Sequence, residues 1–394
     1  MYDIFGDGCV SMNSLFIRNE TEQHWVEKAK QLAEEFKVTS IEHDRNGTFP
    51  FDHFTRLKEE GFTKLTVKAE FGGEDFKLYP FLLVQEEIAK GDGATALCLG
   101  WHNGLFLQLK ETEKWDPSLF ERISKEAAQK GILLNSAATE PKTGSPARGG
   151  KPETEARKTK DGWLISGRKT FTSLAPALDY FIVTAWIEEK NTVGEFLIPK
   201  EADGLVIEET WDTLGMRSTR SDDLLLNQVL VASDALVSLK GMGKSVPQAW
   251  LLHIPAVYLG IAQAARDYAV QFAKDYQPNS LPHPISEVPE VRRKVALMDL
   301  QLMNTRHFMY HAASIWDSQR EERLELGPAL MAVKTAVTNT AIEVVDLAMR
   351  VVGGQSLSKH APLERYYRDV RAGLHNPPSD DITYKVLGDQ AFKM

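Results

Sequence analysis

Hydrophobic positions in the first third of the chain recur at helical spacing. Within residues 22–36, Trp25, Ala29, Leu32 and Phe36 stand three or four positions apart, which places them on one face of an amphipathic helix. Later segments show the same period, and glycines interrupt them as helix-ending residues. The predicted helices of this part of the chain cover residues 22–36, 51–60, 81–90, 94–109 and 118–130.

The pattern changes at Gly131. From there to about residue 240, short runs rich in β-branched and aromatic residues alternate with turns that contain Gly, Pro or Asp. Several short strands at this spacing predict a small β-barrel or sandwich. The predicted strands cover residues 162–167, 180–186, 194–199 and 224–231.

The helical period returns after Gly243, where long helices with short connections predict an antiparallel bundle. The predicted helices here cover residues 249–276, 290–316, 328–352 and 362–371. The expected fold is therefore mainly α with a central β domain. Its three parts are an N-terminal α-helical domain at residues 12–130, a small β-barrel at 131–240 and a C-terminal four-helix bundle at 241–394.

Composition narrows the class of protein. The 394 residues are 43% hydrophobic and 26% charged, which is ordinary for a globular protein. The net charge of −9 argues against a nucleic-acid partner, and no apolar run approaches the roughly 20 residues of a membrane span. The chain shows no secretory signal and has only two cysteines, Cys9 and Cys98, so we expect a cytoplasmic protein without disulfides. Met12 is an alternative start, which would leave residues 1–11 as an extension. No Cys/His cluster has zinc-like spacing, so no metal site is predicted.

Two polar motifs mark a candidate ligand site in the β region. The first is Ala138-Thr-Glu-Pro-Lys-Thr-Gly-Ser145, and the second, Gly167-Arg-Lys-Thr-Phe-Thr-Ser173, follows about 25 residues later. Taken singly, each motif is explained equally well as a loop that ends in a turn. Small residues at such positions let backbone N–H groups approach an anionic or electron-rich ligand.

Two further motifs contain charged residues with glycines, and the second of them has two parts, at residues 349–355 and 363–371. Trp211-Asp-Thr-Leu-Gly-Met-Arg-Ser-Thr219 precedes a predicted strand and is by itself a polar turn. Met349-Arg-Val-Val-Gly-Gly-Gln355 ends a predicted helix, where paired glycines are first of all a C-cap. Taken singly, the charged residues of Leu363-Glu-Arg-Tyr-Tyr-Arg-Asp-Val-Arg371 are explained as a solvated helix face or as weak ion pairs.

Together and in this order, the four motifs resemble those of the acyl-CoA dehydrogenases, over roughly residues 20–385. The resemblance implies a flavoprotein that binds FAD or FMN and assembles into a homotetramer. It also implies that Gly353 and Gly354 approach the outer half of the cofactor across a subunit boundary. The flavin contacts that it implies in the β region are Ala138, Thr139, Gly144, Ser145, Phe171 and Ser173.

Several positions depart from the acyl-CoA dehydrogenase pattern. That reaction needs a carboxylate base to remove the proton alpha to a thioester carbonyl. One usual place of the base, after the last motif, holds Pro377, and the other falls near Trp250, where the ionisable residue is His253. In place of the Arg-x-x-Phe-Gly that usually grips the FAD pyrophosphate, the chain has Tyr276-Gln-Pro-Asn-Ser280, which makes FMN an alternative cofactor.

These departures resemble another branch of the superfamily, the reduced-flavin monooxygenases of the dibenzothiophene monooxygenase type. In that branch a histidine follows the Arg-Asp motif near a proline, as in His375-Asn-Pro377. A histidine on the last long helix of the N-terminal domain and a hydroxyl beside the flavin match His102 and Ser173, and Asn135 matches a flavin-side asparagine. The resemblance implies that His375, His102 and Ser173 are catalytic and hold a C4a-hydroperoxyflavin away from water.

The favoured hypothesis is a two-component monooxygenase that acts on a small substrate, for example an organosulfur compound, with a flavin reductase as its partner. The alternative is an acyl-CoA dehydrogenase that desaturates an acyl-CoA thioester and passes electrons to an electron-transferring flavoprotein. Its catalytic base would be displaced, for example to Asp380 or Asp381. A third hypothesis is a flavin-fold protein kept for binding or assembly after loss of the base.

Overall fold

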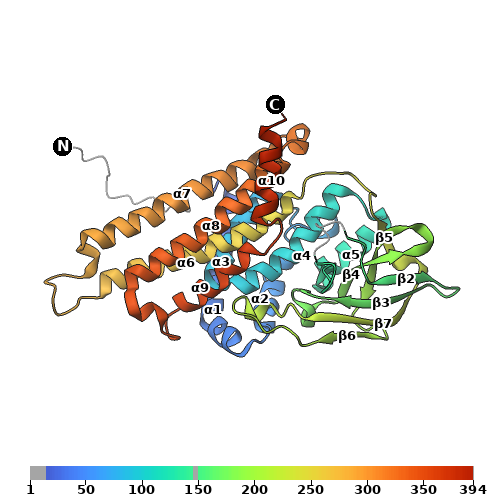
Figure 1. The fold of residues 1–394 in the computed structure, drawn as a ribbon, viewed down its shortest axis with the longest axis horizontal. Helices are drawn as coiled ribbons and strands as arrows, with labels where there is room; N and C mark the ends of the chain where they lie inside the picture. The colour runs from blue at the N-terminus through green and yellow to red at the C-terminus, as the bar shows by residue number, and fades with distance from the viewer. Residues whose placement is uncertain (1–14, 145–149, 394) are drawn as a thin grey trace.

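Long helices and one β-sheet make up the computed structural model, which describes residues 15–144 and 150–393 (Figure 1). No helix in these two stretches is long and apolar enough to cross a membrane. The N-terminal helices are α1 (Glu20–Asn46), α2 (Phe51–Glu59), α3 (Leu78–Gly91), α4 (Gly93–Thr112) and α5 (Pro117–Lys130). The C-terminal helices are α6 (His253–Asp275), α7 (Pro289–Ser318), α8 (Gly327–Val352), α9 (Leu363–Val370) and α10 (Asp380–Ala391).

Side-chain caps and glycines set the helix ends. The Asn19 side chain accepts a hydrogen bond from the Glu22 N–H at the start of α1, and Gly47 ends the helix at φ 63°. The helix runs to Asn46, ten residues past the predicted end at residue 36. The second half of α1 buries Ser40 and Asp44, which a hydrophobic pattern does not register.

Within the described residues, eight strands form one sheet with the order β6-β7-β3-β2-β4-β5-β8, and β1 pairs with β4. The four longest, β3, β4, β5 and β7, are those that the sequence predicts. The four-residue strands β1, β2, β6 and β8 are too short to show a period of two. The strands are β1 (Leu134–Ala137), β2 (Glu155–Lys158), β3 (Trp163–Lys169), β4 (Tyr180–Ile187), β5 (Thr192–Pro199), β6 (Leu205–Glu208), β7 (Asp223–Val231) and β8 (Leu236–Leu239).

Helices from the two ends of the chain share one core. Helix α3 packs against both α1 and α6, and α8 packs against α6 and α7. One hydrophobic cluster includes Phe36 of α1, Phe81 of α3, Tyr258 of α6 and Val337 of α8. The predicted order of helices, central β domain and helices is confirmed, whereas the predicted residue limits of the three domains stay a prediction.

A buried ion pair joins the two motifs of the β domain. Lys169 Nζ lies 2.6 Å from Glu140 Oε1, and both side chains are almost fully buried. Glu140 also accepts hydrogen bonds from the backbone N–H groups of Glu153 and Thr154, at 2.6 and 3.0 Å. Burial alone would raise the pKa of this carboxyl, but the bonds from Lys169 and the backbone lower the pKa to about 2. The loop after β1 is therefore tied to the end of β3.

Replacing Glu140 with glutamine should remove a pH-dependent part of the stability. Because the pKa of Glu140 is lowered on folding, its contribution is complete above the unfolded value of 4.5 and is lost as the pH falls through about 2. Between pH 5 and pH 3 the wild-type free energy of unfolding should fall by about 2 kcal/mol more than that of E140Q. Guanidinium unfolding at both pH values measures the difference.

The matched control is E121Q, which breaks the exposed Lys125–Glu121 pair on α5. This variant should keep the pH dependence of the wild type. An equal pH dependence for E140Q and the wild type would contradict the assignment.

Candidate functional site

The two motifs of the β region lie side by side. The backbone N–H of Thr170 donates to the carbonyl of Thr139, at 2.9 Å. The side chain of Asn135, in β1, donates through Nδ2 to the carbonyl of Ser173, at 3.2 Å. The structure therefore brings together Asn135, Thr139 and Ser173, three of the predicted flavin contacts.

Other predicted contacts belong to the same loop. Ala138 follows β1 directly. Gly144 bridges back to Glu140 with φ 69°, a left-handed conformation that favours glycine. Ser145 lies outside the described residues. The loop therefore returns to its starting point next to the buried Glu140–Lys169 pair.

Phe171 has an unusual conformation for an apolar residue. Its φ is 57°, in the left-handed region, and 61% of the residue is exposed. The ring packs edge-on against Trp211, with centroids 5.6 Å apart. The next residue, Thr172, has a buried Oγ1 with no partner among the described residues. An exposed aromatic ring held in a costly backbone conformation, beside an unused hydroxyl, is typical of a ligand site.

A chain of hydroxyl groups runs away from Ser173 and has a defined direction. Thr219 Oγ1 donates to the Met216 carbonyl, at 2.9 Å, so it must accept from Ser221 Oγ, at 2.8 Å. Ser221 must in turn accept from Ser173 Oγ, at 2.9 Å. Because each hydroxyl has one hydrogen, Ser173 Oγ donates its only hydrogen to Ser221 Oγ, and its lone pairs remain available to accept from another group.

Helix α4 lies against α6 through glycines on one face. A Cβ atom added to Gly93, Gly100 or Gly104 would lie 2.5, 2.2 or 2.6 Å from an atom of Ile261, His253 or Trp250, respectively. Such distances are far shorter than any van der Waals contact, so a larger residue at these positions would displace the side chains of Ile261, His253 or Trp250. The glycines thus fix α4 against the start of α6.

Aromatic side chains gather at this contact. Residues 91–100 and 102–107 are all buried, but Trp101 is partly exposed. Its ring lies edge-on to Trp250 and His253, with centroids 5.8 and 4.9 Å away, and these two rings stack on each other. One helical turn before Trp101, Cys98 Sγ lies 3.7 Å from the Thr219 carbonyl. Since positions three apart share a helix face, the aromatic cluster borders the hydroxyl chain.

His253 is a buried imidazole without hydrogen bonds. Both ring nitrogens lack a partner among the described residues, as do Trp250 Nε1 and Gln85 Oε1 nearby. Burial lowers the pKa of His253 to about 3, so the ring is neutral at physiological pH. Buried polar atoms without partners usually mark bound water or a ligand. The aromatic cluster therefore holds buried polar atoms that could bond to a ligand.

His102 has both ring nitrogens bonded to the backbone. Its Nε2–H donates to the Thr63 carbonyl, at 2.8 Å, and its Nδ1 accepts from the Leu134 N–H, at 3.2 Å. Burial lowers the pKa of the ring to about 4. Because no ring nitrogen is left for a reacting atom, this geometry favours a structural role: His102 attaches the start of β1 to α4.

The predicted C-terminal residues lie on exposed segments. His375 is exposed, and its imidazole makes no hydrogen bond within the described residues. Its neighbour Asn376 accepts a hydrogen bond from the buried Tyr258 hydroxyl of α6, at 2.5 Å. Gly353 and Gly354, at the end of α8, are exposed, and a Cβ at either would meet no atom within 4 Å. No hydrogen bond in the described part of the chain connects these residues with Ser173.

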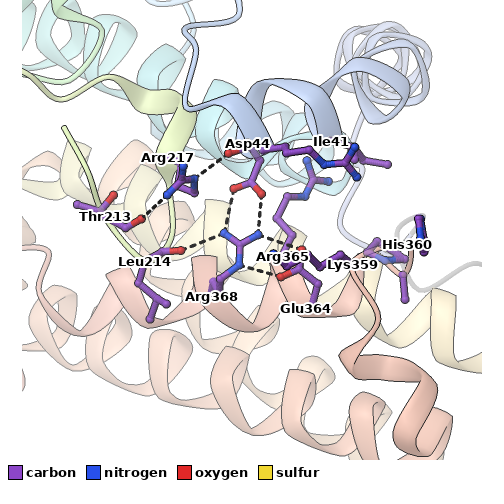
Figure 2. Close-up of a pocket in the computed structure, with 13 residues that line it drawn as sticks. Ile41, Asp44, Thr213, Leu214, Arg217, Lys359, His360, Glu364, Arg365 and Arg368 are labelled. Atoms are coloured by element: carbon purple, nitrogen blue, oxygen red, sulfur yellow. Dashed lines mark hydrogen bonds and ion pairs between the residues drawn. The ribbon is translucent and has the colours of Figure 1, made fainter. Parts of the chain in front are cut away.

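Ion pairs and hydrogen bonds between α1, α9 and the segment before β7 hold the hydroxyl chain in position. Figure 2 shows this junction. Arg368 of α9 makes a bidentate ion pair with Asp44 of α1, at 2.6 and 3.0 Å. The next residue, Asp369, accepts from the Met216 N–H at 2.6 Å, and Arg217 donates to the Asp44 carbonyl at 2.8 Å. These contacts hold the segment that carries Thr219, and a cavity of about 400 Å³ opens beside them. None of the predicted site residues lines this cavity.

Long-range contacts supply the site residues that the sequence does not predict. Ser221 and Thr219 lie in a polar stretch whose hydroxyls have no distinguishing local pattern, and Trp101 and Trp250 read as ordinary core positions. The donor set suits a flavin: an aromatic face at Phe171, a free hydroxyl at Thr172, and no free carboxylate among the residues described above. Asn135, Thr172 and Ser173 would hold the polar edge of such a ring.

Comparison with known proteins agrees with this fold. Three family models match in order: the N-terminal domain of acyl-CoA dehydrogenase at residues 19–112, the middle domain at 135–229 and the C-terminal domain at 252–374. The "Putative acyl-CoA dehydrogenase YdbM" of Bacillus subtilis is 51% identical, over 96% of this chain and 100% of its own length. A 3-(aryl)acrylate reductase of Clostridium sporogenes is 31% identical, over 95% and 99%.

Solved structures extend the comparison. KijD3 in complex with FMN and a dTDP-linked amino sugar superposes with a TM-score of 0.85 at 26% identity, over 98% of this chain and 97% of that one. FMN-bound TdsC of Paenibacillus shares the fold, with a TM-score of 0.83 at 23% identity, over 93% and 96%. The chain therefore belongs to the acyl-CoA dehydrogenase superfamily of flavin-dependent oxidoreductases, whose members bind FAD or FMN.

Proposed function

We propose that this flavoprotein is a reduced-flavin monooxygenase that acts on a small aromatic or organosulfur substrate. The observation that carries the proposal is that neither of the two usual positions of a dehydrogenase base holds a carboxylate. Pro377 occupies one, and the other falls near Trp250. The buried acids beside the hydroxyl chain are both engaged: Asp222 accepts from the Thr210 and Trp211 N–H groups, and Asp369 accepts from the Met216 N–H.

The acids that follow Pro377 are also poor candidates for a displaced base. Asp380 accepts from Asn339 Nδ2 at 2.8 Å and lies 3.5 Å from Lys334 Nζ, so its carboxylate is held against α8. Asp381 is its exposed neighbour in the first turn of α10. Both would have to leave a packed helix to reach a substrate. An enzyme that needs no carboxylate base fits these surroundings better.

The residues around Ser173 suit oxygen chemistry. A bound reduced flavin would supply the activation of oxygen. Ser173 presents lone pairs because its proton is committed to Ser221, so it can accept a hydrogen bond from a donor on the cofactor edge. Asn135 holds the Ser173 carbonyl and so keeps the residue in place. Ser173 and Asn135 can thus orient a hydrogen-bond donor of the cofactor without placing a charged side chain beside it.

The aromatic cluster suits a small substrate and the exclusion of water. Trp101, Trp250 and His253 form an aromatic cluster in which Trp250 Nε1 and both His253 ring nitrogens are buried and unpaired among the described residues. A neutral His253 can give or accept one hydrogen bond to a substrate without drawing in water. A long, charged acyl-CoA chain needs an open slot instead, whereas a small aromatic ring can stack against such a cluster.

The exposed C-terminal residues fit an assembled enzyme. We assign His375 as a hydrogen-bond donor at the reaction centre, reached from the segment that Tyr258 anchors through Asn376. Gly353 and Gly354 are open to approach, which suits contact with the cofactor of a neighbouring subunit in a homotetramer. A monooxygenase of this kind takes its reduced flavin from a flavin reductase, whereas a dehydrogenase would pass electrons to an electron-transferring flavoprotein.

Anaerobic spectroscopy distinguishes the proposal from an acyl-CoA dehydrogenase. The oxidised holoprotein should keep its flavin absorbance when mixed without oxygen with a panel of short-, medium- and aryl-substituted acyl-CoA thioesters. The chemically reduced protein should show a third spectral species in stopped flow when it meets oxygen, before oxidised flavin returns. Bleaching by any acyl-CoA, without that third species, would contradict the proposal and support the dehydrogenase.

Replacing His375 with alanine tests its assigned role. The third spectral species should decay roughly 100-fold faster in H375A, because a preorganised donor has been removed. Flavin affinity, measured by fluorescence titration, should stay within a factor of about three, since the residue is exposed. The control variant His24→Ala changes another exposed histidine, on α1, and should behave as the wild type. An unchanged decay rate in H375A would exclude the role.

A further inference from the structure

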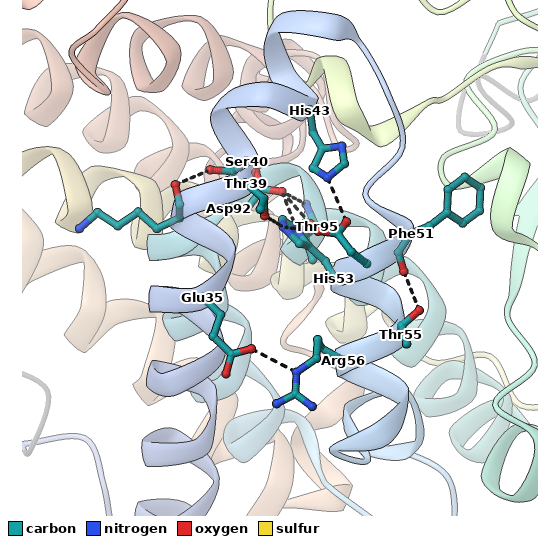
Figure 3. Close-up of polar contacts among 12 residues, drawn as sticks. Glu35, Thr39, Ser40, His43, Phe51, His53, Thr55, Arg56, Asp92 and Thr95 are labelled. Atoms are coloured by element: carbon teal, nitrogen blue, oxygen red, sulfur yellow. Dashed lines mark hydrogen bonds and ion pairs between the residues drawn. The ribbon is translucent and has the colours of Figure 1, made fainter.

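The end of α1 and the start of α2 bring two histidines and an aspartate together: His43, His53 and Asp52. Figure 3 shows the two histidines, with Thr95 and Asp92 beside His53. His43 Nε2 lies 2.9 Å from Asp52 Oδ1, and His53 Nε2 lies 3.9 Å from Asp52 Oδ2. One ligand atom from each residue lies within 4.8 Å of the other two. Two imidazole nitrogens and one carboxylate oxygen are a donor set that Zn²⁺ and related ions prefer.

The hydrogen bonds around His53 fix which nitrogen faces the cluster. Thr95 Oγ1 donates its single proton to Asp92 Oδ2, at 2.6 Å, so it can only accept from His53 Nδ1, at 2.8 Å. Nδ1 therefore carries a hydrogen, which leaves the Nε2 lone pair to accept from Thr39 Oγ1, at 2.7 Å, on the side of the ring where Asp52 Oδ2 lies 3.9 Å away. A buried carboxylate that orients a histidine from behind is the usual support of a metal ligand.

His43 makes similar contacts with the opposite tautomer. Because a carboxylate only accepts, Nε2–H of the neutral ring donates to Asp52 Oδ1, at 2.9 Å, and Nδ1 accepts from Thr48 Oγ1, at 2.9 Å. A bound ion would replace the hydrogen on Nε2. Both histidines thus use Nδ1 for a threonine hydroxyl and turn Nε2 toward the same carboxylate. Two rings that converge in this way give a site with three ligands from two adjacent helices.

Exposure leaves room for an ion and a water ligand. The His53 side chain is 2% exposed and the His43 side chain 19%, whereas that of Asp52 is 52% exposed. Ligand atoms around a tetrahedral Zn²⁺ stand about 3.3 Å apart, so Asp52 must rotate to close the site. Thr39 Oγ1, 2.7 Å from His53 Nε2, would give up this hydrogen bond or become a ligand itself.

We propose that His43, Asp52 and His53 bind one divalent transition-metal ion, with Zn²⁺ the best match, and that the ion fastens α1 to α2. The site has a structural consequence beyond the two helices. His43 precedes Asp44, which holds Arg368 and Arg217 at the junction beside the hydroxyl chain. On the other side, His53 is connected through Thr95 to Asp92, the N-cap of α4.

Metal titration of the chelator-treated holoprotein tests the proposal. Zn²⁺ in calorimetry should bind with one ion per chain, and Co²⁺ should produce the visible absorbance of a tetrahedral site. Bound Zn²⁺ should raise the melting temperature. The variants H43N and D52N, which change exposed or half-buried groups, should each weaken Zn²⁺ binding at least about tenfold while the flavin content stays that of the wild type.

The control His24→Asn removes a histidine on the same helix that lies outside the cluster, and it should bind Zn²⁺ as the wild type does. Absence of stoichiometric binding in the wild type would overturn the proposal. Binding of wild-type strength in both H43N and D52N, or its loss in His24→Asn, would overturn it as well, because the ion would then be held elsewhere. These readouts use no activity, so they are independent of the reaction that the enzyme catalyses.

Discussion

The close approach of α4 to α6 is the constraint on which the site depends. The rings of His253 and Trp250 leave no room for a Cβ on Gly100 or Gly104, so α4 approaches the start of α6 this closely because these two positions are glycines. Helix α4 then directs its side chains in three directions. Trp101 meets Trp250 and His253, Cys98 meets the segment before β7, and His102 meets the start of β1. A shift of α4 would move all of these contacts together, because interiors are close-packed.

Two ion pairs with little exposure to solvent hold the loops around the site in place. The Glu140–Lys169 pair ties the two β-domain motifs to each other, and Arg368 with Asp44 ties α9 to α1. Such pairs contribute less to net stability than their Coulomb attraction, since each ion loses its hydration. These pairs instead determine where the loops lie. An arrangement that separates the partners would leave a buried charge without its counter-ion, so it is strongly disfavoured. The direction of the hydroxyl chain follows from this placement of the loops.

Prediction from sequence succeeds where a signal is local. The long helices and the four long strands follow from periodicity. The predicted end of helix α1 at residue 36 falls short because the buried positions beyond it, Ser40 and Asp44, are polar and escape a hydrophobic pattern. Roles of single histidines are harder to predict. His102 matched a catalytic residue by position, yet both its nitrogens bond to the backbone. His253, which the sequence marks only as the ionisable neighbour of Trp250, is the imidazole with unpaired nitrogens. The His43–Asp52–His53 cluster has no spacing that predicts a metal site, because α1 and α2 bring its members together across a turn.

The sequence by itself determined the order of helices, strands and helices, the superfamily resemblance, and the absence of a carboxylate at Pro377, since these depend on residue identity and local period. Only the tertiary structure decided which side chains meet. The proton of Ser173 is directed by Ser221 and Thr219, 48 and 46 positions further along the chain, and Asp92 orients His53 through Thr95. Such properties come from hydrogen bonds between distant segments, and a hydroxyl or imidazole has no fixed role until its partners are in place.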